Sequence, residues 1–205
     1  MHSAAAPPAP LERPLLVRRD TGTLIVSGDD LVILEATPSS LDAEPSFGAD
    51  ELDEVFRSGP AHPPADHVAP ECSVCGRRAD GLGIHPRPLG DTDLWATVWS
   101  PDSTVSADGT TVSTHVVWGA LDCPAEFAVT RSGRAPLTFF PAVVRLTATL
   151  RGPIVVDRPV AVISWPTREP ERRVDGATAI VDENGTVLAH SEASHARLPL
   201  DFASP

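Results

Sequence analysis

Residues 116–129 read Val-Val-Trp-Gly-Ala-Leu-Asp-Cys-Pro-Ala-Glu-Phe-Ala-Val. Apolar residues dominate this stretch, and they lack the strict alternation of a half-buried strand, so the stretch predicts a helix. Pro124 has no backbone N–H, and it therefore either kinks this helix or stands in its first turn. The residue pattern after this helix predicts only strands.

The last third of the chain has the period-two pattern of a sheet. Every second residue from Phe140 to Leu150 is apolar, which predicts a strand with one buried face. Asn184-Gly185 supplies the backbone conformation of a tight hairpin turn. Strands are predicted at residues 94–99, 140–150, 159–165, 177–181 and 187–197. The whole pattern predicts an α+β fold in which an antiparallel sheet wraps around one central helix.

The first sixty residues predict a smaller N-terminal extension. Three apolar runs between Leu15 and Ala36, separated by turn-forming clusters, predict an antiparallel meander. Residues 48–58 predict a short amphipathic helix with acidic residues near its start. We therefore expect a disordered tail at residues 1–10, the extension at 11–59, a proline-rich connector at 60–71, the main domain at 72–198 and a tail at 199–205.

Composition excludes several classes of function. The 205 residues include 16 basic and 28 acidic side chains, a formal net charge of −12, which argues against nucleic-acid binding. No run approaches the roughly 20 apolar residues of a membrane span, and the N-terminus does not resemble a secretion signal. Three cysteines fit a reducing compartment, so we expect a cytoplasmic protein. The absence of Lys and Tyr excludes a lysine Schiff base and a tyrosine acid.

Asp122 is the side chain in the helical stretch that most needs an explanation. Burying a carboxylate costs several kcal/mol unless it is hydrogen-bonded. One interpretation is a general base or nucleophile at a cleft. The other is a helix N-cap, with Pro124 in the first turn. The residue pattern leaves both open.

Five short motifs together resemble a known family. They are Cys72-Ser73-Val74-Cys75-Gly76, Gly81-Leu82, Trp99-Ser100-Pro101-Asp102, Val117-Trp118-Gly119-Ala120-Leu121-Asp122-Cys123-Pro124 and Ile163-Ser164-Trp165-Pro166. In this order, over about residues 67–198, they resemble actinobacterial hotdog-fold proteins of the thioesterase superfamily. The resemblance implies a hotdog fold, a curved antiparallel sheet enclosing one helix. It also implies a homodimer or dimer of dimers with sites at the subunit interface.

The resemblance implies hydrolysis of an acyl thioester, either acyl-CoA or carrier-bound, without a cofactor. Asp122 matches the carboxylate that activates water or attacks the thioester, and backbone N–H groups near the helix start, around Val116, Val117 and Trp118, polarise the carbonyl. The relatives carry His-Gly-Gly where this chain has Ser113 to Val117. This departure favours the alternative of a non-catalytic hotdog module that binds an acyl group or another hydrophobic molecule. A dehydratase is the weaker enzyme interpretation, because Asn184 is the only Asn.

Other side chains are candidates for the same site. His115 precedes Asp122 by two helical turns on one face, although it could also cap or pack. Glu126 follows Asp122 by one turn and could act as a second carboxylate, although a solvated position is favoured. Coenzyme A phosphates would need arginines, and each of these could instead be ordinary surface. The candidates are Arg131, Arg134, Arg168, Arg172 and Arg173.

Cys72 and Cys75 have the spacing of a metal knuckle. His62, His67 and His85 are near enough in sequence to complete four ligands. One such pair alone is a weak signal, and the alternative is two free thiols at a tight turn made by Gly76. We therefore assign no metal from the sequence, and we interpret Cys123 as small core packing.

Overall fold

A computed structural model describes residues 14–28, 31–41, 45, 47–63, 65, 67, 69–130, 137–169 and 172–200. The predicted tail at residues 1–10 lies outside these ranges, as do Arg131 and Arg134. Contacts divide the chain into two compact units, residues 1–40 and 41–205.

The first unit is a three-stranded antiparallel sheet, as predicted. Its strands β1 (Leu16–Asp20), β2 (Thr23–Gly28) and β3 (Leu31–Ala36) lie in the order β1-β2-β3. Thr21 and Gly22 join the first two strands with φ values of 44° and 89°, which is the conformation of a two-residue hairpin turn with positive φ at both positions. The Thr21 hydroxyl donates a hydrogen bond to Asp20 Oδ1 at 2.8 Å.

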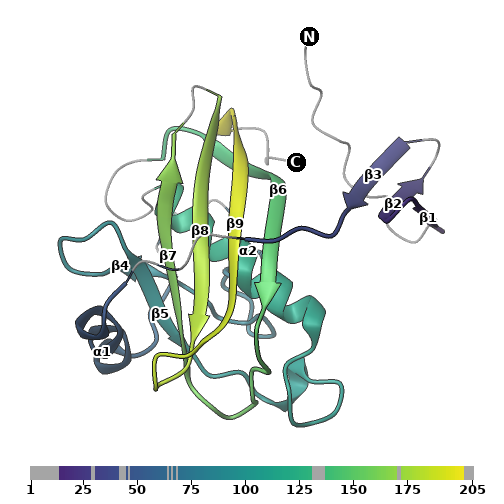
Figure 1. The fold of residues 1–205 in the computed structure, drawn as a ribbon. Coiled ribbons are helices and arrows are strands. Elements are labelled where there is room, and N and C mark those ends of the chain that lie inside the picture. The colour runs from purple at the N-terminus through teal and green to yellow at the C-terminus, as the bar shows by residue number, and fades with distance from the viewer. Residues whose placement is uncertain are drawn as a thin grey trace. The chain divides into compact units, whose positions relative to one another are not determined.

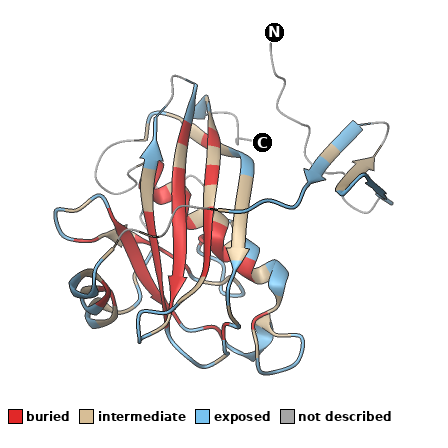
Figure 2. Ribbon diagram, in the orientation of Figure 1, coloured by how far each residue is buried: buried red, intermediate tan, exposed pale blue. Residues whose placement is uncertain are grey.

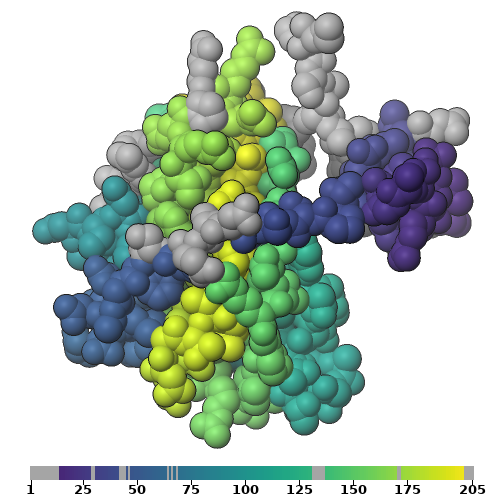
Figure 3. Space-filling model, in the orientation of Figure 1, coloured from purple at the N-terminus to yellow at the C-terminus, as the bar shows by residue number. Residues whose placement is uncertain are grey.

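The second unit contains a six-stranded sheet in which every strand pair is antiparallel. The strand order is β4-β5-β7-β8-β9-β6 (Figure 1). In the space-filling view β9 (yellow) and β6 (green) lie side by side (Figure 3). The strands are β4 (Arg87–Pro88), β5 (Trp95–Trp99), β6 (Phe140–Leu150), β7 (Val160–Arg168), β8 (Arg173–Val181) and β9 (Val187–Leu198). The five predicted strands of this sheet are confirmed, and β4 is an addition.

The long helix α2 (Thr114–Thr130) packs on one face of this sheet, behind β8 and β9 in Figure 1. Gly176 on β8 permits a close approach, because a Cβ atom there would lie 2.8 Å from Val129 Cγ1 and 3.2 Å from the Ala125 carbonyl oxygen. Pro124 lies inside the helix, so its placement in the first turn is wrong. The short 3-10 helix η1 (Ser103–Val105) precedes α2.

The helix α1 (Ala49–Ser58) packs against the sheet with its own side chains. Its residues Leu52 and Val55 join a core cluster with Ala161 and Ile163 of β7. The alternate β7 residues, Val160 and Val162, instead join the cluster that contains the α2 residues Val117, Ala120 and Leu121. The strand β7 is therefore buried on both faces, which explains its run of consecutive apolar residues. Figure 2 shows the same burial in β5, in residues 160–164 of β7 and in most of β8.

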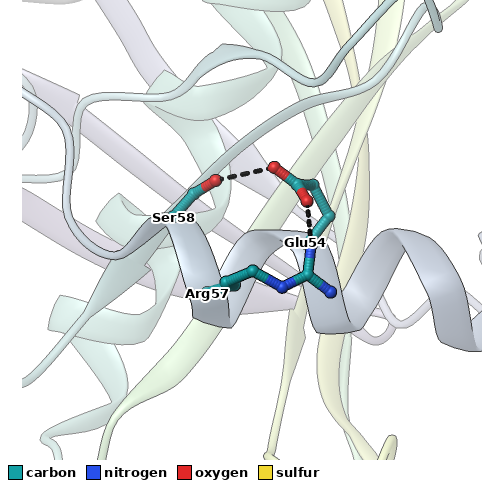
Figure 4. Close-up of polar contacts among 3 residues, drawn as sticks. All are labelled: Glu54, Arg57 and Ser58. Atoms are coloured by element: carbon teal, nitrogen blue, oxygen red, sulfur yellow. Dashed lines mark hydrogen bonds and ion pairs between the residues drawn. The ribbon is translucent and has the colours of Figure 1, made fainter.

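The exposed side of α1 is held by local hydrogen bonds. Glu51 Oε2 accepts a hydrogen bond from the Gly48 N–H at 2.9 Å, which satisfies a backbone donor at the helix start. Near the helix end, Glu54 accepts hydrogen bonds from Arg57 and from Ser58 (Figure 4). Among the residues that the structure describes, no helix is both long enough and apolar enough to cross a membrane.

Candidate functional site

Asp122 lies in the interior of α2, eight residues after the helix begins at Thr114. The N-cap interpretation is therefore wrong. Its carboxylate is half-buried, and within the described ranges it has no hydrogen bond or ion pair. Burial and the negative charge of Cys72 raise the pKa of Asp122 to about 6. An unpaired acid with a raised pKa is typical of a functional site.

Glu126 lies one helical turn after Asp122 and is also half-buried rather than solvated. Burial, the neighbouring Asp122 and the charge of Cys72 raise its pKa to about 8. At neutral pH the two carboxyl groups therefore differ in protonation, since Asp122 is mostly ionised and Glu126 mostly neutral. Such a difference suits Asp122 to act as a base and Glu126 to act as an acid.

Cys72 to Gly76 form a tight turn, as the spacing predicts. The Gly76 N–H donates to the Cys72 carbonyl at 2.9 Å, and the Cys72 N–H donates to the Ala69 carbonyl at 3.0 Å. A Cβ atom on Gly76 would lie 2.4 Å from the Cys72 carbonyl oxygen. Only glycine therefore fits this position without a shift of the backbone. We refer to residues 72–76 as the knuckle.

The knuckle rests on α2 beside Asp122. Val74 Cγ2 would lie 3.1 Å from a Cβ atom on Gly119, so the missing side chain of Gly119 makes room for it. One turn further along the helix, Cys123 Sγ lies 3.6 Å from Cys72 Sγ. Cys123 thus joins the two cysteines that the sequence had paired.

The three sulfur atoms lie within 4.8 Å of one another. Cys75 is fully buried, and the cluster packs against Trp95, Phe127 and Ala128. A hydrogen bond from the Cys123 thiol lowers the pKa of Cys72, and the same contact raises the pKa of Cys123. The contact therefore favours the thiolate form at Cys72 over that at Cys123, and Cys72 contributes to the raised pKa of Asp122.

One of the three candidate histidines reaches this cluster. His67 Nε2 lies 3.2 Å from Cys75 Sγ, and its ring packs on Phe127 with the ring centroids 5.2 Å apart. His85 is buried, and its ring nitrogens lie 3.2 Å from the Ala61 carbonyl oxygen and 2.9 Å from that of Gly76. His62 is exposed. Spacing along the chain could not distinguish these three residues.

The start of α2 lies away from Asp122. His115 is exposed in the first turn, and Trp118 is 39% exposed. The N–H groups of Val116 and Val117 both donate to the Ser113 carbonyl, at 2.9 Å and 3.2 Å. The helix cap therefore already uses the N–H groups of Val116 and Val117.

The described arginine candidates lie where β7 turns into β8. Arg168, Arg172 and Arg173 are exposed, and Arg168 Nε lies 3.6 Å from Asp175 Oδ2. Because Gly176 packs against Val129, this end of β8 lies beside the C-terminal part of α2.

Comparisons with known proteins give structural neighbours only. No protein-family model matches the chain, and a search of curated proteins finds no match. Among solved structures, a thioesterase-superfamily protein matches with a TM-score of 0.54 and 16% identity, over 62% of this chain and 63% of its own. This match spans less than two thirds of that neighbour's length.

Two further neighbours are similar. Zebra fish thioesterase superfamily member 2 matches with a TM-score of 0.51 and 10% identity, over 74% of this chain and 99% of its own. The E. coli PaaI protein from the phenylacetic acid degradation operon matches with a TM-score of 0.50 and 11% identity, over 58% and 83%. With its single long helix against a six-stranded antiparallel sheet, this chain has the hotdog fold of thioesterase-superfamily structures.

Proposed function

We propose that this protein hydrolyses an acyl thioester, with Asp122 as the general base or the nucleophile. The observation that carries the proposal is the Asp122 carboxylate itself. It is half-buried on the central helix of a hotdog fold, it has no hydrogen-bond or ion-pair partner within the described part of the chain, and its pKa is raised to about 6. A pKa below neutral leaves this carboxylate ionised and able to accept a proton.

The chemistry follows from that ionised carboxylate. As a base, Asp122 takes a proton from water while the oxygen of that water bonds to the thioester carbon. The tetrahedral intermediate then collapses, the C–S bond breaks, and the proton passes from Asp122 to the leaving sulfur. As a nucleophile, Asp122 itself bonds to the carbon, the C–S bond breaks and a thiolate leaves. Water then hydrolyses the mixed anhydride, which restores the Asp122 carboxylate, and the proton that this water releases passes to the thiolate. Both routes yield a carboxylic acid and a thiol.

Polarising the thioester carbonyl requires donors from elsewhere. Helix geometry leaves the N–H groups of the first turn without intrahelical partners. Because the N–H groups of Val116 and Val117 donate to the Ser113 carbonyl, we assign the polarisation of the thioester carbonyl to the N–H groups of Thr114 and His115. Their N–H groups lie about 10–12 Å of helix rise from Asp122. One carbonyl cannot span that distance, so we propose that the helix start of a second copy meets Asp122.

The edge strand β6 is where we place the second copy. It ends the strand order and pairs with β9 alone among the described strands. It also exposes apolar side chains that water solvates poorly, namely Val143, Val144 and Leu150, at 45%, 57% and 42%. A long apolar edge is a template for pairing with another chain. We therefore propose a homodimer, with a dimer of dimers as its further assembly.

The substrate is proposed as an acyl-CoA or a carrier-bound acyl group. Trp118 offers an exposed apolar surface for the acyl chain, and Glu126 completes the wall beside Asp122. Arg168, Arg172 and Arg173 offer cations for coenzyme A phosphates. The three cysteines are free, which suits the reducing conditions of the cytoplasm.

The test is a panel of acyl-CoA esters with short, long and aromatic acyl groups. Coenzyme A release, measured by chromatography, should exceed the buffer rate for at least one ester. Chromatography is preferred to thiol reagents, because the protein contributes three thiols of its own. If every ester survives at the buffer rate, the hydrolase proposal is overturned.

One structural observation favours a second candidate function. Residues 113–117 at the helix start contain no glycine, where the resemblance implies His-Gly-Gly, and the N–H groups of Val116 and Val117 already donate to the Ser113 carbonyl. These features suit a non-catalytic module that binds an acyl group. Saturable binding of an acyl-CoA that is recovered intact would support this second function over the first.

A further inference from the structure

We propose that Cys72, Cys75, Cys123 and His67 bind one zinc ion, which fastens the knuckle to α2. This inference does not rest on the proposed hydrolase, because it requires only that four side chains share one tetrahedral centre. It goes beyond the sequence, where the spacing of Cys72 and Cys75 pointed to two thiol ligands and gave no third.

The sulfur atoms already have the separations of a metal site. Zinc–sulfur bonds of about 2.3 Å at tetrahedral angles place two sulfurs about 3.8 Å apart. Cys72 Sγ and Cys123 Sγ are 3.6 Å apart, and all three sulfurs lie within 4.8 Å of one another. A disulfide would use only two of the three sulfurs, whereas a metal ion uses them all.

His67 is the fourth ligand that we assign. Its Nε2 lies 3.2 Å from Cys75 Sγ, and a tilted ring contact with Phe127, with an interplanar angle of 57°, holds the ring beside the cluster. Coordination through Nε2 places the ring proton on Nδ1. In the structure Nδ1 accepts a long hydrogen bond of 3.4 Å from the Ala69 N–H. Zinc binding would break this hydrogen bond, because a protonated Nδ1 is a donor. Three thiolates and one imidazole form a closed set of the kind found in structural zinc sites.

The surrounding backbone holds the knuckle in place without the ion. The Val74 N–H points at Cys72 Sγ at 3.4 Å, as suits a thiolate acceptor. His85 Nε2 contacts the Gly76 carbonyl oxygen at 2.9 Å, and this contact anchors the end of the knuckle. The Ile84 N–H donates to the Val74 carbonyl at 3.0 Å. Such outer contacts orient metal ligands in known sites.

The ligand types indicate zinc rather than a hard cation. Thiolate and imidazole suit zinc, whereas magnesium and calcium prefer oxygen donors. The ion would tie a loop to a helix about fifty residues later in the chain. Because Cys123 follows Asp122 directly on α2, the same ion would fix the helical turn that carries the proposed catalytic carboxylate.

Metal content of the full-length protein is the first measurement. Protein purified under reducing conditions and loaded with zinc should retain about one ion per chain after desalting. Cobalt in place of zinc should give sulfur-to-cobalt charge-transfer absorption and the intense visible bands of a tetrahedral site. X-ray absorption at the zinc edge should show three sulfurs and one nitrogen in the first shell. These readouts use the wild-type chain, so they do not depend on any variant that fails to fold.

Variants then assign the ligands. Cys72→Ser, Cys75→Ser and Cys123→Ser should each lower the cobalt–sulfur absorption by at least about one third, because each variant removes one of the three thiolates. His67→Ala should weaken zinc affinity by more than the roughly 10- to 100-fold typical of losing an outer contact, while the matched control His62→Ala, at an exposed histidine, should bind as the wild type does. Reduced, folded protein that retains no zinc, or that binds it through oxygen and nitrogen only, would overturn the proposal.

Discussion

His195 is buried on β9, at 2% exposure. Burial lowers the pKa of His195 to about 4, although the Val174 backbone and the Asp175 carboxylate oppose part of this effect. The unfolded chain binds the proton near pH 6.5 and the folded chain only near pH 4. Stability is therefore full above pH 6.5 and falls as the pH is lowered toward 4.

Replacing this histidine should remove that pH dependence. Between pH 7 and pH 5 the wild type should lose about 2 kcal/mol of unfolding free energy more than His195→Met loses. Urea unfolding of both proteins at the two pH values measures the difference. Parallel losses in the two proteins would show that the folded protein takes up the proton at His195 as readily as the unfolded chain does.

Two residues of the candidate site show which side chains the sequence could single out and which it could not. Asp122 could be singled out, because burying a carboxylate in an apolar helix is costly wherever that helix begins. Cys123 could not be joined to Cys72 and Cys75, because their contact crosses about fifty residues and depends on how the knuckle lies against α2. A total of three cysteines was the only signal that pointed to it.

At the scale of elements, the contact between α2 and β8 depends on the absence of one side chain. A Cβ atom on Gly176 would lie 2.8 Å from Val129 Cγ1 and 3.2 Å from the Ala125 carbonyl oxygen. Gly176→Ala should therefore push the helix from the sheet and cost about 1–3 kcal/mol of unfolding free energy. Thermal or urea unfolding measures this loss.

The matched control is another glycine with ordinary space around it. At Gly152 the nearest atom to an added Cβ is Leu188 Cδ2, at 3.5 Å. Gly152→Ala should change stability by less than about 0.5 kcal/mol. Equal losses of unfolding free energy in the two variants would contradict the close contact between α2 and β8 at Gly176.

The long elements were predictable because their patterns repeat. Period-two alternation located β6, and an Asn-Gly turn located the hairpin between β8 and β9. The strand β4 has only two residues and η1 only three, which is too short for any period to show. The start of α2 was placed two residues late, since Thr114 and His115 extend the helix through polar positions.

At the scale of the whole molecule, the proposed dimer is tested at the exposed edge of β6. Val144 is 57% exposed, and Val144→Glu would place acidic groups from two copies near each other, which is costly at an interface. Light scattering after gel filtration should give the dimer mass for the wild type and the monomer mass for the variant.

The exposed Val155 supplies the control for that experiment. It is 43% exposed and lies outside β6, so Val155→Glu should leave the dimer intact. A monomeric wild type would contradict the proposed dimer. A Val144→Glu protein that remains dimeric would contradict an interface at β6.

The order of strands in the sheet could not be derived from the residue pattern. Alternation marks which face of a strand is buried but does not identify its neighbours, so the return of β6 to the edge beside β9 came from the structure. The same holds for α1, whose apolar face was predicted but whose packing against β5 and β7 was not.

The most direct test of the account is the rate of thioester hydrolysis by Asp122→Asn, relative to wild type, on the best ester of the panel. The change keeps the shape of the side chain and removes its ability to accept a proton. If Asp122 is the base or nucleophile, kcat/KM should fall at least about 100-fold while the unfolding curve keeps its shape. An unchanged kcat/KM would contradict the role assigned to this carboxylate.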